Sequence, residues 1–298
     1  MPTRAGSFHL FRIFGIDVYV HYFWFLAVAY FVSQSRGYSS PIWSIGECLS
    51  MFLIVLIHEF GHAFACRSVG GQANQIILWL FGGVAYVSPP QRPGAQLWSI
   101  AAGPLVNVML LPILTGLWFV AGRAGWAETA PETYRLLFHV QAINIILLVF
   151  NMMPIYPLDG GQILRSLLWF IFGRANSLLI ASTIGFIGVG VLVLVAIWLK
   201  SMWLGLMAAF ILINCWGGLK QARALGRIAK LPRREGFACP SCKTPPPLGA
   251  LWRCGKCGNA FDTFLTQATC PHCGVQYNVT QCLDCGTSSP IAAWQAQS

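Results

Sequence analysis

The chain has 298 residues, of which 56% are hydrophobic and only 9% are charged, and its mean hydropathy is positive. About a quarter of the residues in soluble globular domains are charged, so this composition excludes an ordinary soluble protein and indicates an integral membrane protein. The formal net charge of +10 could suggest nucleic acid. Most of the basic residues, however, flank apolar segments, where they orient a chain in the membrane and attract lipid headgroups. We therefore do not predict a nucleic acid partner.

Six apolar segments follow along the chain, most of them near the roughly 20 residues that cross a bilayer as a helix. They occupy residues 19–32, 49–66, 97–121, 136–152, 177–199 and 202–219, and the first is short. Each is expected to be helical, because an unclosed strand would leave backbone polar groups unpaired in hydrocarbon. The predicted fold is an all-α polytopic membrane protein of about six transmembrane helices over residues 1–230, followed by a small C-terminal domain.

The distribution of basic residues predicts the orientation. Arg4 and Arg12 precede the first segment as in a secretory signal, but no small-residue cleavage site follows, so we expect a retained helix. Six crossings would put both termini on one side. With the termini in the cytoplasm, twelve of the Lys and Arg residues up to Arg234 lie inside and four lie outside, namely Arg36, Arg123, Arg135 and Lys200. This excess predicts cytoplasmic termini.

Residues 231–298 differ sharply in composition, because hydrophobic runs vanish there and cysteine becomes dense. Eight of the eleven cysteines form four C-x-x-C pairs: Cys239 and Cys242, Cys254 and Cys257, Cys270 and Cys273, and Cys282 and Cys285. This spacing lets two thiolates on one tight turn reach a single tetrahedral zinc. A disulfide framework would need an oxidising compartment, which the predicted cytoplasmic location does not provide.

These pairs predict a cytoplasmic zinc-ribbon-like domain with two four-cysteine sites that hold two structural zinc ions. The simplest pairing is sequential, the first two pairs forming one site and the last two the other, and an interleaved arrangement stays open. Metal would supply the folding free energy that so small a segment lacks. The tail has only Lys243, Arg253 and Lys256 against Asp262 and Asp284, which favours a regulatory protein partner over nucleic acid.

The segment HEFGH, residues 58–62, puts three ionisable groups inside the second apolar segment. Such groups are costly in a membrane and indicate function. On a helix His58 and His62 share a face and can bind one metal ion, and Glu59 lies beside them as a general base. Zinc in such a site lowers the pKa of water for attack on a carbonyl.

A catalytic zinc usually has three protein ligands, so one more ligand is required. Asp159 is the candidate, since it stands in NMMPIYPLDGG, residues 151–161, where two prolines and two glycines prevent regular helix at the end of the fourth apolar segment. Irregular backbone at membrane depth is tolerated only where it is buried in protein or lines a cavity. An ordinary turn aspartate before glycines is the alternative.

Together these segments resemble the site-2 protease family of intramembrane zinc metalloproteases, whose motifs are HExxH and NxxPxxxLDG. The segments AAGPLVN, residues 101–107, and FGGVAYV, residues 81–87, resemble further family motifs, and the resemblance covers roughly residues 8–220. The compact branch known from bacterial sporulation, which lacks a PDZ domain, is the most similar. That branch often carries a CBS domain where this chain has cysteine pairs, so the regulation and partners of that branch are not inferred for this chain.

The resemblance implies that His58, His62 and Asp159 bind one catalytic zinc, that Glu59 is the general base, and that a transmembrane protein is cleaved in a bacterial-type inner or cytoplasmic membrane. Gly103 and Pro104 would interrupt their helix and allow close approach. Asn107 would bind substrate or a developing oxyanion, or else join helices. The stretch 78–87, with Gly82 and Gly83, is expected to bind an unwound substrate as an added strand.

Two other functions are compatible with the same residues. A membrane protein of this fold that no longer cleaves could bind clients and use the zinc-rich tail as an adaptor. A metal transporter would need a path of ligands, whereas one HExxH motif with one remote aspartate offers a single closed cluster. The Glu59→Gln variant separates these functions, because a protease should keep its metal and lose turnover.

Overall fold

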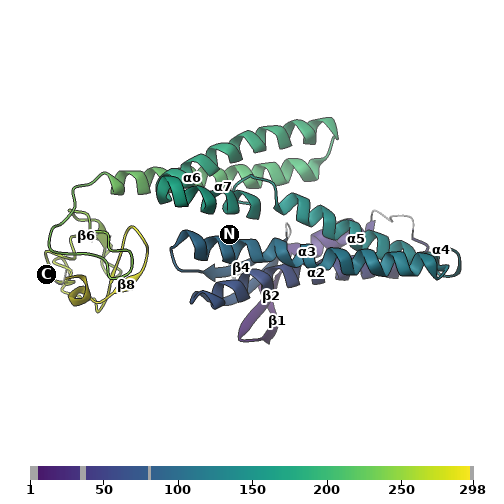
Figure 1. Cartoon of the computed structure of the whole chain (residues 1–298), viewed down its shortest axis with the longest axis horizontal. Helices are drawn as coiled ribbons and strands as arrows, with labels where there is room; N and C mark the ends of the chain where they lie inside the picture. The colour runs from purple at the N-terminus through teal and green to yellow at the C-terminus, as the bar shows by residue number, and fades with distance from the viewer. Residues whose placement is uncertain (1–5, 34–37, 80–81, 296–298) are drawn as a thin grey trace.

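The structure is a computed structural model that describes residues 6–33, 38–79 and 82–295 (Figure 1). Arg4, Arg36 and residues 80–81 of the predicted strand lie outside this description. The helices are α1 (Phe23–Ser33), α2 (Pro41–Ser68), α3 (Pro93–Arg123), α4 (Trp126–Thr129), α5 (Pro131–Asn151), α6 (Asp159–Trp198), α7 (Met202–Ala229) and the 3-10 helix η1 (Ile291–Trp294). The strands are β1 (Ser7–Ile13), β2 (Ile16–His21), β3 (Gln72–Trp79), β4 (Gly82–Ser88), β5 (Trp252–Arg253), β6 (Ala260–Phe261), β7 (Thr280–Gln281) and β8 (Ser288–Ser289).

The predicted mostly helical membrane fold is confirmed, with a correction to the first segment. Within the described residues, five helices are long and apolar enough to cross a membrane, namely α2, α3, α5, α6 and α7. Residues 19–32 are not one helix, because β2 extends to His21 and α1 has only 11 residues. At 1.5 Å per residue α1 spans about 16 Å, roughly half of a hydrocarbon core.

A four-stranded sheet in the order β1-β2-β3-β4 covers one side of α2, and sequence analysis predicted only part of its last hairpin. The β2 and β3 strands pair in parallel, whereas the outer pairs are antiparallel. Ile16, Val18 and Val20 alternate along β2 and are buried in one apolar cluster with Leu56 and Ala63 of α2. The sheet thereby packs on the half of α2 that carries the HEFGH segment and leaves β4 at its edge.

Two helices approach each other closely beside that segment. A Cβ added at Gly61 of α2 would lie 2.7 Å from the carbonyl oxygen of Ala102 in α3. Glycine is therefore required for α2 and α3 to pack at this distance, as is common between membrane helices. The helix α3 continues through Pro104, so the expected interruption is wrong, whereas the expected close approach at Gly103 is present.

The α6 helix is two helices joined at Gly173, whose φ of 74° and ψ of 173° are not helical. The second part contains the predicted segment 177–199, and the first part begins with Asp159. Before it, residues 152–158 fold back over the helix start. Added Cβ atoms at Gly160 and Gly161 would lie 2.3 Å from the Met152 carbonyl oxygen and 2.4 Å from the Ile155 carbonyl carbon, so no larger residue fits this turn.

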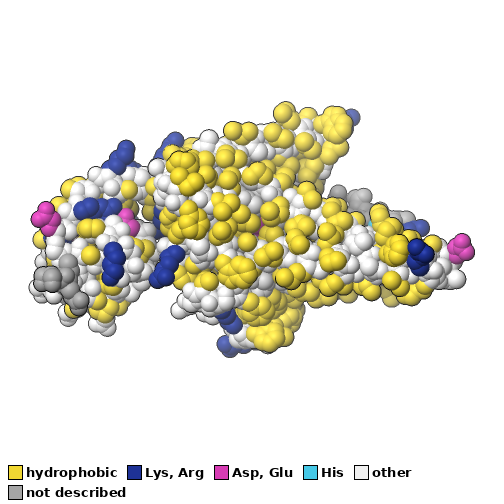
Figure 2. Space-filling model, in the orientation of Figure 1, with side chains coloured by type: hydrophobic (Ala, Val, Ile, Leu, Met, Phe, Trp, Pro, Cys, Tyr) yellow, Lys and Arg dark blue, Asp and Glu magenta, His cyan; other side chains and the backbone are white. Residues whose placement is uncertain are grey.

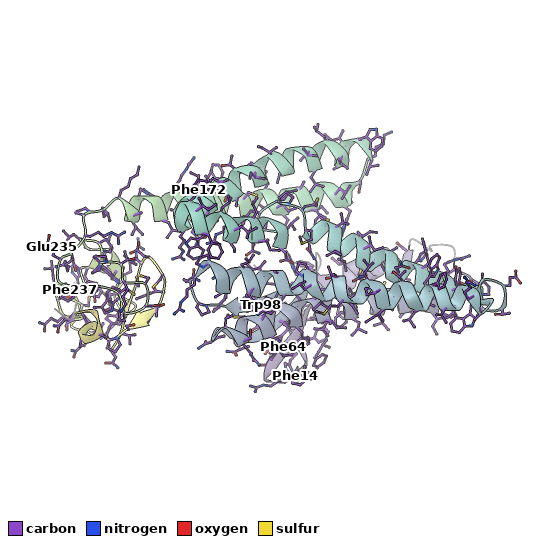
Figure 3. The ribbon with its side chains drawn as sticks, in the orientation of Figure 1. Phe14, Phe64, Trp98, Phe172, Glu235 and Phe237 are labelled. Carbon is purple, nitrogen blue, oxygen red and sulfur yellow. The ribbon has the colours of Figure 1, made fainter. Side chains whose placement is uncertain are left out.

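The surface of the helices is apolar between two charged ends (Figure 2). Apolar side chains cover the long helices, and Lys and Arg side chains gather where the helices meet the C-terminal domain. Exposed aromatic residues include Phe14 and Phe64, whose rings contact edge to face below α2 (Figure 3). An apolar belt with basic residues at its border is typical of a protein embedded in a bilayer.

The C-terminal domain lies beyond the end of α7 (Figure 1) and contacts the membrane domain through one of its turns. Within the C-terminal domain, Arg233 forms a two-pronged ion pair with Asp284, with N–O distances of 2.7 and 3.1 Å. Arg174, next to the Gly173 bend of α6, donates a hydrogen bond to the carbonyl oxygen of Asp284. The domain is therefore anchored at the turn 282–285, and this turn belongs to one of its cysteine groups.

Candidate active site and cysteine groups

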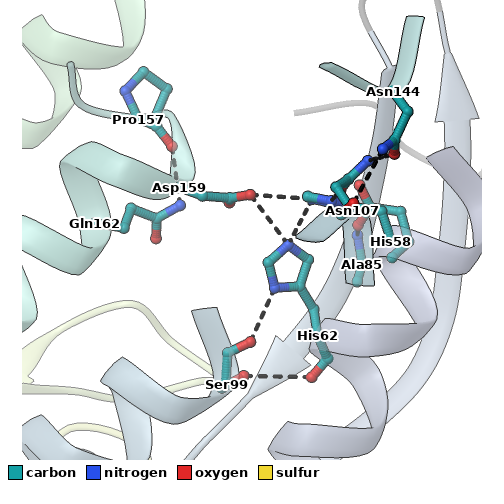
Figure 4. Close-up of polar contacts among 10 residues, drawn as sticks. His58, His62, Ala85, Ser99, Asn107, Asn144, Pro157, Asp159 and Gln162 are labelled. Carbon is teal, nitrogen blue, oxygen red and sulfur yellow. Dashed lines mark hydrogen bonds and ion pairs between the residues drawn. The ribbon is translucent and has the colours of Figure 1, made fainter. Parts of the chain in front are cut away.

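Three side chains from distant segments converge within the helical domain (Figure 4). The Nε2 atoms of His58 and His62 lie 3.1 Å apart, as the i, i+4 spacing on α2 predicts. Asp159 Oδ2, from the first turn of α6, lies 3.0 Å from His58 Nε2 and 3.4 Å from His62 Nε2. The exposed fractions of His58 and His62 are only 5% and 8%, so the cluster is shielded from bulk solvent.

This cluster has the chemistry and spacing of a zinc site. Two imidazole nitrogens and a carboxylate oxygen form the three-ligand set of catalytic zinc sites, which leave a fourth position open. Zinc bonds to such atoms of about 2.0 to 2.1 Å put neighbouring ligands of a tetrahedron about 3.3 Å apart. The separations of 3.0, 3.1 and 3.4 Å are close to that value, so the residues fit one ion.

The other nitrogen of each imidazole binds an oxygen behind the cluster. His58 Nδ1 lies 2.5 Å from Asn107 Oδ1, and His62 Nδ1 lies 2.9 Å from the carbonyl oxygen of Ser99 (Figure 4). Because both partners accept hydrogen bonds, both Nδ1 atoms carry the proton and both Nε2 lone pairs face Asp159. Such outer partners fix the tautomer and the ring orientation of metal-binding histidines. Sequence analysis missed the role of Ser99, since a backbone carbonyl leaves no sequence signal.

Asn107 stands behind His58 and contacts both α2 and α5. Its side chain is fully buried, and its Nδ2 donates to Asn144 Oδ1 on α5 over 2.8 Å. Asn144 donates in return to the Asn107 carbonyl oxygen over 3.0 Å. Both ends of the Asn107 side chain are therefore engaged within the protein. These contacts fit the alternative expectation, an asparagine that joins helices, and the expected contact with substrate stays a prediction.

Glu59 is held by the edge strand of the sheet. Its Oε2 accepts a hydrogen bond of 2.7 Å from the N–H of Ala85 in β4, and its exposed fraction is 6%. Gly83 lies directly against it, since an added Cβ would be 2.4 Å from Glu59 Cγ and 2.7 Å from Oε1. Gly82 has open space around it and a φ of +130° that favours glycine. The strand thus positions the carboxylate beside the histidine cluster.

The eight cysteines of the C-terminal domain form two groups of four, but their pairing differs from the sequential expectation. Cys239 and Cys242 meet Cys282 and Cys285, whereas Cys254 and Cys257 meet Cys270 and Cys273. The second group is nested between the halves of the first. Each two-stranded ribbon, β5 with β6 and β7 with β8, encloses only one of these turns. The bridge of Phe237 with Gln295 joins the two ends of the domain, and the spacing of the cysteines does not show such a contact.

Both groups have the dimensions of tetrahedral zinc–thiolate sites. The closest sulfur pairs across the turns are separated by 3.5 to 3.8 Å, whereas Zn–S bonds of about 2.3 Å predict about 3.8 Å between ligands. The Tyr277 hydroxyl donates to Cys254 Sγ over 3.1 Å. Together with the backbone N–H of Cys257, this bond lowers the pKa of the Cys254 thiol to about 5. A thiolate is the form that binds metal.

Comparison with known proteins agrees with this geometry. Residues 47–132 and 123–195 match peptidase family M50, and this region includes His58, Glu59, His62 and Asp159. The chain belongs to peptidase family M50. The resemblance to site-2 proteases that the sequence motifs indicated is thereby confirmed, and with its five apolar helices the chain is an integral membrane protein.

Several family members are similar over much of the membrane domain. A zinc metalloprotease of Methanocaldococcus jannaschii is 31% identical over 179 residues, and a putative zinc metalloprotease of Synechocystis is 32% identical over 240 residues. These matches cover 60% and 74% of this chain and 50% and 60% of those proteins, so the chain spans little more than half of their length. Stage IV sporulation protein FB of Bacillus subtilis is 32% identical over 118 residues, or 39% of this chain and 38% of that protein.

A solved structure shares the fold. The site-2 protease from Methanocaldococcus jannaschii superposes with a TM-score of 0.54 at 25% identity, covering 72% of this chain and 95% of that one. The comparison therefore supports the arrangement of the membrane helices and leaves the role of the cysteine groups to be inferred from their own geometry.

Gly103 provides a test of the proposed metal ligands. A Cβ added there would lie 2.3 Å from His62 Nε2 and 2.7 Å from His58 Nε2, so Gly103→Ala should push both nitrogens apart. Elemental analysis of the purified chain should then show a loss of about one zinc ion per chain. Gly116→Ala in the same helix is the control, because nothing lies within 4 Å of its added Cβ. Full zinc content in Gly103→Ala would contradict the assignment.

The nested pairing makes a separate prediction for zinc stoichiometry. Cys239→Ser combined with Cys282→Ser alters one group, so the double variant should lose one tail zinc. Cys239→Ser combined with Cys254→Ser alters both groups and should lose two. Sequential pairing predicts the opposite result for the two double variants. The same elemental analysis, with each single variant alongside, distinguishes the arrangements.

Proposed function

We propose that the protein is a zinc metalloendopeptidase that hydrolyses a peptide bond within or near a transmembrane segment of a membrane-protein substrate. The observation that carries this proposal is the convergence of His58, His62 and Asp159 from α2 and α6, two helices that are apolar enough to cross the membrane. Membership of a peptidase family and the names of the related zinc metalloproteases support it. The buried position of the cluster among apolar helices favours a substrate that is itself in the membrane.

The residues of the site divide the chemistry between them. Zinc held by His58, His62 and Asp159 would act as a Lewis acid that polarises the scissile carbonyl and lowers the pKa of water. Glu59 would accept the proton of the attacking water and return it to the leaving amine nitrogen. Ser99 and Asn107 are positioning residues, since their oxygens hold the imidazoles with both Nε2 atoms toward Asp159.

The carbonyl of a peptide bond inside a helix is already hydrogen-bonded, so the substrate helix must unwind locally before cleavage. We propose that the unwound substrate segment then pairs with the free edge of β4 as an added strand. Support comes from the position of β4 at the end of the sheet order, with Glu59 bound to Ala85 on that edge. Backbone groups of a strand alternate in direction, so Val87 N–H faces the same edge as Ala85 N–H. Gly82 and Gly83 keep this edge free of side chains near Glu59.

We also propose an orientation of the chain in the membrane and a role for the C-terminal domain. The basic residues favour both termini in the cytoplasm of a cell with a bacterial-type inner membrane. Two structural zinc ions in the cysteine groups would fold the C-terminal domain. Its contact with Arg174 of α6 supports a position beside the membrane domain, where a regulatory protein bound to the tail could act on the protease.

The decisive test of the reaction is Glu59→Gln, which keeps the shape of the side chain and removes the base. Clients that copurify with this variant are identified by mass spectrometry and then incubated with either form. The original chain should cleave them in a transmembrane segment, and the variant should be about 100-fold slower or more, with unchanged zinc content. Equal cleavage by both forms would exclude Glu59 as the base, whereas clients bound but cleaved by neither form would indicate an adaptor.

Strand addition is tested by Val87→Pro, because proline removes the outward N–H and is tolerated at a strand edge. Val87→Ala is the matched control, since it shortens the side chain and keeps the N–H. Loss of one hydrogen bond to substrate should slow cleavage about fivefold relative to the control, without loss of zinc. Equal rates in the two variants would contradict strand addition at this position. Substitution of Gly83 is less informative, because its new side chain would displace Glu59.

A further inference from the structure

A basic groove lies between α6 and α7 at the end nearest to the C-terminal domain. It has a volume of about 630 Å³ and is lined by Arg223, Arg227 and Lys230 of α7 and by Asn176 of α6. Leu179 and Ala222 provide an apolar wall. The spacing of the three basic residues at i, i+4 and i+7 puts them on one face of α7. None of them takes part in the proposed peptidase chemistry.

In the described part of the chain, no carboxylate neutralises the positive charges of this groove. Among residues 6–33, 38–79 and 82–295, no carboxylate forms an ion pair with Arg223, Arg227 or Lys230, and all three side chains are exposed. The next two arginines, Arg233 and Arg234, are bound instead to Asp284 and Asp262. The groove therefore offers three unpaired cations at one place and would attract an anion.

The length of α7 places the groove at a membrane surface. Lys200 directly precedes this helix, which begins at Met202, and about 20 residues cross the hydrocarbon core. The far border of the core then falls near Ala222, so that Arg223, Arg227 and Lys230 lie in the headgroup layer. Trp216, half exposed and with the Lys220 ammonium 5.7 Å from its ring centre, precedes this border on the same helix.

We propose that this groove binds the phosphate of an anionic phospholipid, such as phosphatidylglycerol, from the leaflet that faces the C-terminal domain. The cations would contact the phosphate, Asn176 offers an amide donor, and Leu179, 40% exposed, would contact an acyl chain. Basic residues next to a transmembrane helix bind anionic lipids through this kind of contact. A soluble phosphate compound shares the charge but not the acyl chain, so it would gain nothing from the apolar wall.

The test uses the full chain in neutral detergent and native mass spectrometry with phosphatidylglycerol or phosphatidylcholine of identical acyl chains. Phosphatidylglycerol should remain bound to the original chain, and the triple variant Arg223→Gln, Arg227→Gln, Lys230→Gln should bind it at least about tenfold more weakly. The control is Lys243→Gln, Arg253→Gln, Lys256→Gln, which removes equal charge from the C-terminal domain and should bind like the original chain. Zinc content verifies that each variant is folded.

Two further results would overturn the proposal. Equal retention of phosphatidylglycerol and phosphatidylcholine would show that the groove does not select a negative headgroup. Displacement of the lipid by an equimolar amount of inorganic phosphate would show that the site recognises a soluble anion. Resistance to inorganic phosphate, together with selective loss in the groove variant, would support a lipid site that is independent of the peptidase activity.

Discussion

The close contact between α2 and α3 is the constraint on which the candidate metal site depends. Gly61 lets the Ala102 carbonyl approach α2, and Gly103 leaves the space in which the two His Nε2 atoms lie. The same helix α3 provides the oxygen acceptors for His58 and His62. The packed interface of α2 and α3 therefore sets the distance between the two imidazole rings and their orientation. A methyl group at either glycine would move the helices apart or fill the site, although no charged residue would have changed.

Other elements around this interface position the two carboxylates of the site, Asp159 and Glu59. The fold-back of residues 152–158 brings Asp159 to the start of α6, which is possible because Gly160 and Gly161 have no side chains. The sheet packs on α2 and presents Ala85 N–H to Glu59. An ionisable residue in a membrane is expensive unless it is paired or hydrogen-bonded. Each of the four central side chains has such a partner, so function and stability are served by the same contacts.

Much of this site could be predicted from sequence because local geometry determines it. The i, i+4 spacing of His58 and His62 on a helix fixes their shared face, and Asp159 stood out as one of few acidic residues in an apolar chain. For Asn107 two roles stayed open, because its link to Asn144 depends on the packing of α3 against α5, which the sequence does not show. The first sheet strands were missed because the apolar β2 continues directly into α1, so that hydropathy alone merges the two.

The nested cysteine groups illustrate the same limit, since four identical C-x-x-C turns contain no information on which turns meet. The central claim concerns the other metal site: one zinc ion shared by His58, His62 and Asp159. Crystals of the zinc-loaded full chain, measured at wavelengths on both sides of the zinc absorption edge, test it most directly. The account predicts an anomalous peak about 2 Å from both Nε2 atoms and from an Asp159 carboxylate oxygen. Zinc peaks in the C-terminal domain without one at these three residues would contradict it.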